Sequence, residues 1–388
     1  MRQSWRAPFV GVLVVTAMAL AGCGGSSPGS GANAGVVQIG FITPLTGPSS
    51  TTGIDARDGA ALAVELANKA GALKDKKVEL KIEDDKGTPE AGVVAYQKLR
   101  DQGVNFISGT MNSSVAVALG SQVNADPDVL YFISGAQSQI PLDQQTGGNV
   151  FGLTHTNAMY ANANLGYIES VSKPKTIAFL GENSDFGAAE QKTLETRWAN
   201  GGPKIVLKET FDRTLTDFSS ILGKVRDSGA EGLYVAAASS TIVASIFVQA
   251  DRLGLHVEKF MNAGLMSPDL IKAGGKAVNG ITSADIYNPS LDNPDNKEFV
   301  SAFQAKYNRQ PTSLNSLGYD SIKLLVAAMA KSGKANDSKA VAQTLRDNSW
   351  TSTRGPLVFD KTGRAQTDTL IISIENGKLV VVDKVKQK

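Results

Sequence analysis

From Val36 onward, short apolar runs with a strand-like pattern alternate with stretches whose apolar residues recur at helical spacing. In the first part of the chain, the strand-like runs are 36–43, 78–83, 105–109 and 130–134. The segments between them have helical patterns. Thr88 is placed to cap one helix, with Pro89 in its first turn, and another helix begins near Ser113. Strand, helix and strand at this spacing predict a parallel sheet with right-handed crossovers.

The same pattern returns after an irregular, polar region at 136–157. Strands are expected at 176–180, 205–210, 232–237, 259–262 and 281–286, with helices at 185–199, 217–228 and 240–253. Three further helical stretches, 296–307, 316–331 and 339–346, precede strands at 355–359, 369–374 and 379–382. Two α/β units followed by a mixed tail indicate two lobes of similar plan, with the tail returning to complete both.

The N-terminus has a separate character. Arg2 and Arg6 precede an apolar run at 9–20, which small residues follow up to Cys23. A basic start, a short apolar run and small residues predict a secretory signal peptide at 1–22, and the run is too short to span a bilayer comfortably. The tetrapeptide Leu-Ala-Gly-Cys resembles the bacterial lipobox. That resemblance implies that Cys23 becomes the lipidated first residue, and the alternative is a chance cysteine in an ordinary signal peptide.

Residues 24–35 consist entirely of Gly, Ser, Ala, Asn and Pro, so they have little to bury and are expected to form a flexible tether. A chain of this length has a root-mean-square reach of roughly 20 Å. Together with acylation of Cys23, the tether predicts an exported protein anchored through lipid to the outer face of the cell membrane.

Charge and composition exclude several classes of function. Removal of 1–22 takes away two arginines and no acidic residue, so the formal charge falls from 39 − 37 = +2 to 37 − 37 = 0. A neutral body argues against nucleic acid as a partner. Two histidines, and no cysteine besides Cys23, leave little for a metal site, so neither a metal nor a cofactor is expected.

Several segments together resemble the extracytoplasmic leucine/isoleucine/valine-binding proteins. They are 37–47 (VQIGFITPLTG), 82–85 (IEDD) with 88–91 (TPEA), 103–109, 217–219, 254–255 and 318–320. The resemblance covers nearly the whole chain after the tether. It implies the type I periplasmic-binding fold, with two doubly wound parallel-sheet lobes joined by a three-strand hinge. Lobe one would contain 36–156 and 287–355, and lobe two 157–286 and 356–388.

The same resemblance implies a solute receptor of an ABC importer, with a membrane permease as partner and a monomeric state. The ligand would lie in the cleft between the lobes. In the family, the serine matching Ser113 binds the ligand carboxylate, beside the free amides at the start of a helix. The alternative is that Ser113 only caps its own helix. Gly135 permits close backbone approach to a ligand, and Gln137 stands where relatives use a threonine hydroxyl.

In lobe two, Phe186 lies where relatives often carry a tyrosine that walls the pocket. Ser239 replaces an aromatic residue, and Gly264 lies in the run where the family has a glutamate that pairs with the ligand ammonium. Thr52 likewise replaces an aromatic residue of lobe one. A buried ammonium without a carboxylate costs several kcal/mol. These departures weaken the expectation of an amino acid. They favour a small polar or anionic solute, a class that includes compounds without an α-ammonium group as well as branched-chain amino acids and related compounds.

Other chemistry-bearing residues have alternative interpretations. Asp285, near a crossover, is a candidate replacement for the missing glutamate. His155 and Tyr160 lie near the first crossover, as cleft or hinge residues. Asp84 and Asp85 resemble paired carboxylates, but adjacent strand residues point to opposite faces, so they are expected either to cap a loop or to be solvated.

Two other functions were weighed. One is an exported enzyme, but the sequence has no P-loop, no Gly-x-Ser-x-Gly elbow and no metal-ligand cluster, so we expect no enzyme. The other is a sensor that passes a ligand signal to a membrane receptor. Neighbouring genes for a permease would favour transport.

Overall fold

The structure is a computed structural model, and it describes residues 35–47, 49–212, 214–237 and 239–386. The predicted signal peptide, Cys23 and almost all of the tether lie outside the described residues. The fold is therefore considered from Gly35, which begins one compact unit that extends to the C-terminus.

The first lobe is built on a parallel sheet of five strands in the order β2-β1-β3-β4-β5. The strands are β1 (Val36–Thr43), β2 (Lys77–Asp84), β3 (Phe106–Gly109), β4 (Leu130–Ile133) and β5 (Val150–Gly152). The first four confirm the predicted runs. Strand β5 lies in the region predicted to be irregular, because three residues at a sheet edge are too short to show a strand pattern.

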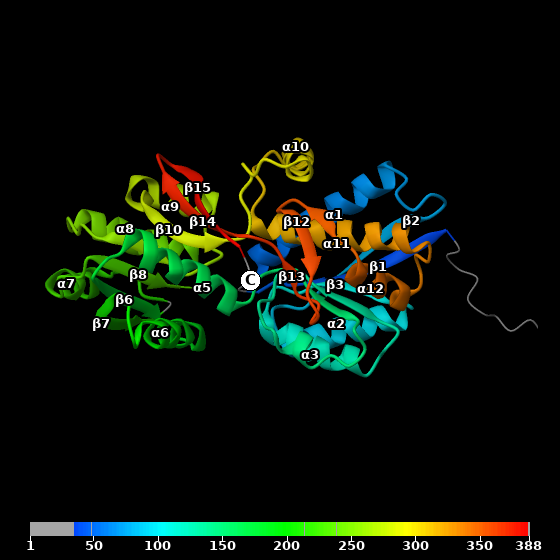
Figure 1. Ribbon diagram of the computed structural model, residues 1–388, viewed down its shortest axis with the longest axis horizontal. Helices are drawn as coiled ribbons and strands as arrows, with labels where there is room; N and C mark the ends of the chain where they lie inside the picture. The colour runs from blue at the N-terminus through cyan, green and yellow to red at the C-terminus, as the bar shows by residue number, and fades with distance from the viewer. Residues whose placement is uncertain (1–34, 48, 213, 238, 387–388) are drawn as a thin grey trace, which may run out of the picture. The chain divides into compact units, whose positions relative to one another are not determined.

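Helices cover both faces of this sheet (Figure 1). They are α1 (Ser50–Lys69), α11 (Ser313–Ser332) and α12 (Ser338–Asp347) on one face, and α2 (Pro89–Asp101) and α3 (Ser113–Asn124) on the other. Thr88 caps α2 as expected, since its side chain accepts a hydrogen bond from the amide of Ala91. Helix α10 (Pro294–Tyr307) and the short α4 (Ile140–Asp143) complete the lobe.

Helices α1 and α11 pack very closely along one another. A Cβ atom added to Gly318 would lie 1.9 Å from the carbonyl oxygen of Ala56, and one added to Gly59 would lie 1.9 Å from that of Asn315. Glycine at these two positions therefore allows backbone to touch backbone.

The second lobe contains a sheet of seven strands in the order β15-β14-β10-β9-β8-β6-β7. The strands are β6 (Thr176–Glu182), β7 (Lys204–Phe211), β8 (Gly232–Ala236), β9 (Glu258–Met261), β10 (Ile281–Asp285), β14 (Thr369–Glu375) and β15 (Lys378–Val385). The first five of these are parallel, and β14 and β15 join antiparallel at the edge. All seven match predicted strands.

The helices of the second lobe are α5 (Asn157–Tyr167), α6 (Asp185–Trp198), α7 (Ser219–Asp227), α8 (Ser240–Arg252) and α9 (Pro268–Gly274). Two short turns of other helix types, Ile168–Ser172 and Gly275–Val278, follow α5 and α9. Helix α5 was not predicted, because its sequence contains three asparagines and a glycine, which are weak helix formers. Its cap is Thr156, whose side chain accepts from the amide of Met159.

A small antiparallel sheet corrects one predicted boundary. It consists of β11 (Trp350–Ser352), β12 (Gly355–Phe359) and β13 (Ala365–Gln366). The ring of Phe359 meets Phe132 and Phe151 edge-on, with centroids 5.7 and 5.1 Å away. Since these partners belong to β4 and β5, β12 packs with the first lobe, whereas the sequence placed 356–388 in the second. The chain thus returns to the second sheet only at β14.

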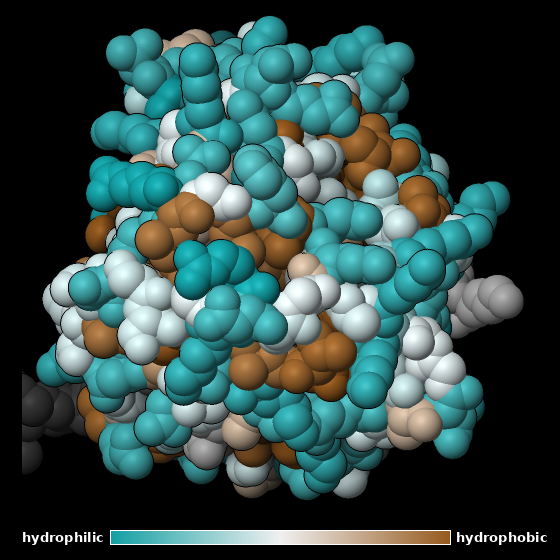
Figure 2. Space-filling model, turned by 90° about the vertical axis from the view of Figure 1, so that its left-hand side faces the viewer, coloured by the Kyte–Doolittle hydropathy of each residue, from teal (hydrophilic) through white to brown (hydrophobic). Residues whose placement is uncertain are grey.

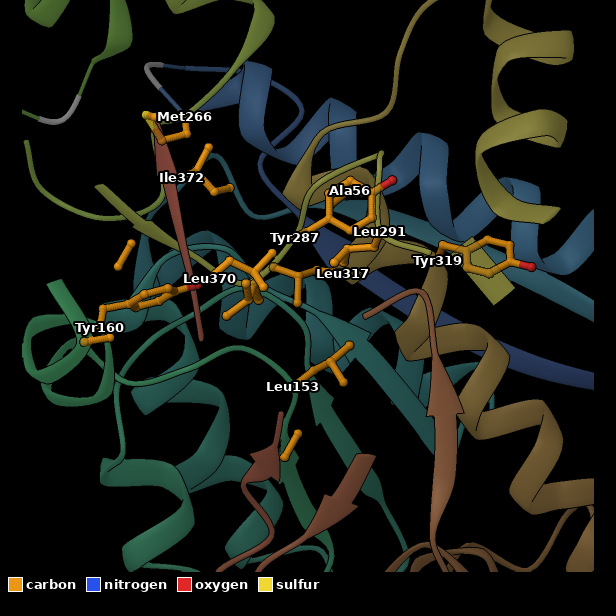
Figure 3. Close-up of a cluster of buried hydrophobic side chains, with 14 of the residues drawn as sticks. Ala56, Leu153, Tyr160, Met266, Tyr287, Leu291, Leu317, Tyr319, Leu370 and Ile372 are labelled. Atoms are coloured by element: carbon orange, nitrogen blue, oxygen red, sulfur yellow. The ribbon is translucent and has the colours of Figure 1, made fainter. Parts of the chain in front are cut away.

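The chain passes between the two sheets after β5, after β10 and before β14. The apolar core continues through these passages. Figure 3 shows part of one buried cluster, in which Leu153, Leu317 of α11 and Leu370 of β14 belong to the same set. The outer surface is mixed in character. On the face shown in Figure 2, hydrophobic residues lie between hydrophilic ones, as on most soluble proteins.

Candidate functional site

A small polar recess lies where the carboxyl ends of β8 and β9 meet helices α5 and α6. It is lined by Gln137, Asn157, Tyr160, Ala161, Asn164, Phe186, Glu190, Tyr234, Asn262 and Ala263. Parallel α/β sheets bind ligands at this end of the strands. The recess has a volume of about 40 Å³, so it accommodates a small polar group of a ligand.

Helix α6 supplies two side chains of the recess. Phe186 and Glu190 are four residues apart, so they lie on the same side of the helix. Ser184 caps the helix by accepting a hydrogen bond from the amide of Gly187 at 3.2 Å. Phe186 also packs against the core of the second lobe. Phe186 thus lines the recess and also packs on the core, and the same helix adds a carboxylate, Glu190, that the sequence did not indicate.

The carboxylate of Glu190 is held from below by strand β8. The hydroxyl of Tyr234 donates to Oε2 of Glu190 at 2.9 Å. Burial raises the pKa of Glu190 above its ordinary value, and the hydrogen bond from Tyr234 offsets only part of that rise. The pKa of Tyr234 is itself raised, first by burial and then by the neighbouring Glu190, so this phenol stays neutral.

Asn164 of α5 completes the floor of the recess. Its Nδ2 donates to the carbonyl oxygen of Met261 at 3.0 Å and to the hydroxyl of Tyr234 at 3.4 Å. Its Oδ1 is buried and has no hydrogen-bond partner among the described residues. Asn262 is fixed differently, because its Oδ1 accepts from the amide of Ala237 at 3.0 Å.

The first lobe contributes Gln137 to the recess. A Cβ atom on Gly264 would lie 4.0 Å from Nε2 of Gln137, so these two predicted site residues approach each other from different lobes. Gly264 has φ +85°, a conformation that favours glycine, and its amide donates to the carbonyl oxygen of Ala284 at 3.2 Å.

Thr52 and Ser113 lie near each other on the first lobe, outside the lining of the recess. Thr52 donates to the carbonyl oxygen of Ser49 at 2.7 Å, and Nδ2 of Asn112 donates to Oγ of Ser49 at 3.2 Å. Ser113 is the first residue of α3, and the cap position belongs to Asn112, whose side chain makes no capping hydrogen bond. Ser113 therefore does not cap its own helix.

Gly135 and Ser239 also lie outside the recess lining. A Cβ atom on Gly135 would lie 2.5 Å from Sδ of Met111, so a protein side chain fills the space that the sequence analysis reserved for ligand. Ser239 occupies the cap position of α8, and its Oγ lies 2.8 Å from Oγ1 of Thr241.

The remaining candidates have structural partners. His155 is fully buried between Oγ1 of Thr367 and Oγ1 of Thr369, at 3.1 and 2.9 Å. Burial, with nearby Arg354, lowers the pKa of His155 to about 3. Asp285 is buried outside the recess lining, and burial raises its pKa to about 7.

The acidic pair at the end of β2 caps a loop, as predicted. Oδ1 of Asp84 accepts from the amides of Leu45 and Lys86, each at 2.8 Å. Oδ1 of Asp85 accepts from the amide of Gly87, also at 2.8 Å. These carboxylates hold the turns on either side of the strand end.

Sequence reasoning missed Glu190, Tyr234, Asn164 and Asn262. Only Glu190 had a readable signal, because it lies one helical turn after Phe186. Asn164 lies on a helix that was not predicted. Tyr234 lies within a predicted strand and Asn262 at the end of one. The face of the sheet on which each side chain lies cannot be predicted without the order of the strands.

Two α/β lobes, joined by three passages and sharing a polar recess, define the architecture of a bilobal binding protein. A family model described as periplasmic binding protein matches residues 36–378. The chain therefore belongs to the periplasmic binding protein family, and the expected kinship with leucine/isoleucine/valine-binding proteins is confirmed. Residues described by the structure contain no helix long and apolar enough to cross a membrane.

The chain is 27% identical to Leu/Ile/Val-binding protein homolog 3 of Brucella melitensis, across 89% of this chain and 93% of that protein. The branched-chain amino acid binding protein LivJ of Streptococcus pneumoniae, in complex with isoleucine, has a TM-score of 0.80 and 21% identity, covering 91% of this chain and 100% of that one.

The second structure is a solute-binding protein of an ABC transporter from Rhodopseudomonas palustris, in complex with 3,4-dihydroxy benzoic acid. It has a TM-score of 0.79 and 23% identity, covering 90% of this chain and 97% of that one. At these identities the two structures establish the fold alone.

Proposed function

We propose that this protein is the lipid-anchored, extracytoplasmic solute receptor of an ABC importer, and that it captures a small polar solute without chemical conversion. The observation that carries the proposal is the recess, to which Gln137 comes from one lobe and Phe186, Glu190 and Tyr234 from the other. A ligand that contacts both lobes stabilises their closed arrangement by its differential affinity. The closed form would then dock on the membrane permease.

The ligand class is a branched-chain amino acid or a related small compound. The named ligands of similar structures, isoleucine and a dihydroxy benzoic acid, are both small acids that carry a carboxylate. Within the site we assign Gln137, Gly264 and Phe186 to direct contact with ligand. Thr52 and Ser113 form a second polar patch on the first lobe, suited to the ligand carboxylate. Gly135 packs against Met111, and the hydroxyl of Ser239 lies at the start of α8 beside that of Thr241.

Calorimetry of the purified protein with amino acids and small organic acids tests the binding function. Small-angle scattering with and without the tightest ligand tests closure, and sedimentation tests the proposed monomer. We expect compaction on saturation. An unchanged radius of gyration with saturating ligand would remove the closure step from the proposal.

Anchoring is tested separately at Cys23. Cells that express the full chain and are supplied with labelled palmitate should yield labelled protein in the membrane fraction. The variant Cys23→Ala should lose the label and leave the membrane fraction. Label that persists in this variant would contradict lipidation at Cys23.

A further inference from the structure

The recess offers hydrogen-bond acceptors but no cation. Its side chains include the carboxylate of Glu190, to which the hydroxyl of Tyr234 already donates, and Asn164, whose unpartnered Oδ1 is buried; the amide groups of Gln137, Asn157 and Asn262 also line it. Among the described residues that line the recess there is no lysine, arginine or histidine. The recess therefore calls for a ligand group that donates several hydrogen bonds.

The acceptor on Asn164 is fixed by its own amide. Asn164 is 1% exposed, and its Nδ2 donates to the carbonyl oxygen of Met261. A flipped amide would put two oxygens against each other, so Oδ1 must face the other way. A buried carbonyl oxygen without a donor costs about 1–3 kcal/mol, which a ligand N–H would recover.

The carboxylate of Glu190 also lacks a partner, in this case a positive charge. A buried carboxylate favours its neutral form unless a positive charge lies nearby. Tyr234 gives it one hydrogen bond but no charge. A cationic ligand group would supply that charge, and the aromatic rings of Phe186, Tyr160 and Tyr234 around the recess also favour a cation.

We propose that Glu190 and Asn164 together receive a protonated primary amine of the ligand. An ammonium group has three N–H donors, of which one serves Glu190, one serves Oδ1 of Asn164 and one is left for the amide oxygen of Gln137. It is about as large as a water molecule and fits a recess of about 40 Å³. The carboxylate that is absent near Gly264 is thus supplied from α6.

This inference rests on the proposed function and narrows it to amine-bearing solutes. It separates the two ligand types found in similar structures, because isoleucine has an amine and 3,4-dihydroxy benzoic acid has none. Glu190 is thereby the residue that determines specificity between them.

The test is calorimetric titration of the full-length protein with isoleucine, leucine, valine and alanine. Each is paired with the α-hydroxy acid of the same carbon skeleton, and 3,4-dihydroxy benzoic acid is included. We expect at least one amino acid to bind, and its hydroxy acid to bind about 100-fold more weakly or worse. The variant Glu190→Gln should lose at least about 100-fold in affinity for that amino acid.

Two controls keep the result interpretable. Glu190→Gln retains an oxygen that can accept from Tyr234, and an unchanged melting temperature would show that the variant folds. Glu195→Gln lies on the same helix, where Glu195 pairs with Lys208 on the surface, and it should bind as the wild type does.

Three outcomes overturn the inference. If only acids without an amine bind, or if Glu190→Gln binds the amino acid as tightly as the wild type, the receptor function stands and the role of Glu190 falls. If no compound of either class binds the wild type, the proposed function falls with it.

Discussion

Nδ1 of His155 lies 2.9 Å from Oγ1 of Thr369, and this contact joins the passage after β5 to the start of β14. The two residues before His155 are hydrogen-bonded to the same C-terminal segment. Arg354 donates to the carbonyl oxygen of Leu153 at 3.1 Å, and Arg364 donates to that of Thr154 at 2.9 Å. Three consecutive residues of one passage are thus bonded to the segment that leads into another.

The buried His155 predicts loss of stability in acid. Its pKa is lowered to about 3 in the folded state from an ordinary value of 6.5, so the unfolded state binds the proton first as pH falls. Between pH 7.5 and pH 5, this should cost the wild type about 2 kcal/mol. The glutamine in His155→Gln does not titrate in this range. The amount by which the wild type exceeds this variant in unfolding free energy should therefore decrease by about 2 kcal/mol from pH 7.5 to pH 5.

Urea unfolding at the two pH values measures this change. The comparison with the variant is needed because Asp85 and Asp285, whose pKa values burial raises to about 6 and about 7, act in the opposite sense. A gap between wild type and His155→Gln that does not change with pH would contradict the prediction.

Asp285 predicts the opposite pH dependence. Burial raises its pKa from 3.8 to about 7, so the folded state holds the proton more tightly and stability declines as pH rises from about 4 to 7. Oδ1 accepts from the amide of Ile286 at 2.7 Å, and Asn can keep that bond. We expect Asp285→Asn to be more stable than the wild type by up to about 4 kcal/mol at pH 8 and to gain nothing at pH 4. Denaturation curves at both pH values check this.

The ion pair of Arg354 and Asp320 is fully buried, with Nε 3.5 Å from Oδ2. Removal of one partner leaves an uncompensated charge, so Asp320→Asn should cost about 3–5 kcal/mol in unfolding free energy. The exposed pair of Lys297 and Asp292 is a matched control, and Asp292→Asn should cost less than about 1 kcal/mol. Equal losses of unfolding free energy in the two variants would show that burial does not determine the cost of breaking an ion pair.

The contact between α1 and α11 predicts a steric effect. Gly318→Ala places a methyl group 1.9 Å from the carbonyl oxygen of Ala56, which requires the helices to separate and should cost at least about 2 kcal/mol. Gly223 lies within α7 with no neighbouring atom within 4 Å of an added Cβ. Gly223→Ala should therefore be neutral or stabilising by up to about 1 kcal/mol. Thermal unfolding of both variants measures the difference.

Binding of an amine at Glu190 predicts coupling to protons. Because the pKa of Glu190 is raised by burial, a cation that favours the ionised form drives proton release, and affinity should fall as pH falls. Tyr234, which faces the carboxylate, stays neutral throughout. The binding enthalpy at acidic pH should then vary with the ionisation enthalpy of the buffer in the wild type, and this variation should be absent in Glu190→Gln.

Much of the fold was predictable, because parallel strands buried on both faces form continuous apolar runs between helices with clear caps. The strands β1 and β12 begin and end where the sequence indicated. Strand β5 and helix α5 were missed, since the first is very short and the second is rich in asparagine. The placement of β12 was wrong because Phe359 packs on Phe132 and Phe151, a choice that local pattern does not encode.

The site was predictable only in part. Phe186 and Gln137 line the recess, and Gly264 lies beside Gln137, since each follows a strand end that the topology brings together. The acceptor pair of Glu190 and Asn164 depends on how α5 and α6 pack over β8. That packing is a property of tertiary structure, and a pattern of residues along one helix does not contain it.

The bonds from residues 153–155 to the segment that ends at Thr369 have a mechanical consequence for ligand capture. Two bodies connected at three separate points resist bending in every direction, whereas two points define an axis of rotation. Because hydrogen bonds join the passage after β5 to the passage before β14, these two passages act as one connection between the lobes. The passage after β10 is the second connection. We therefore expect the lobes to open and close by rotation about a single hinge axis.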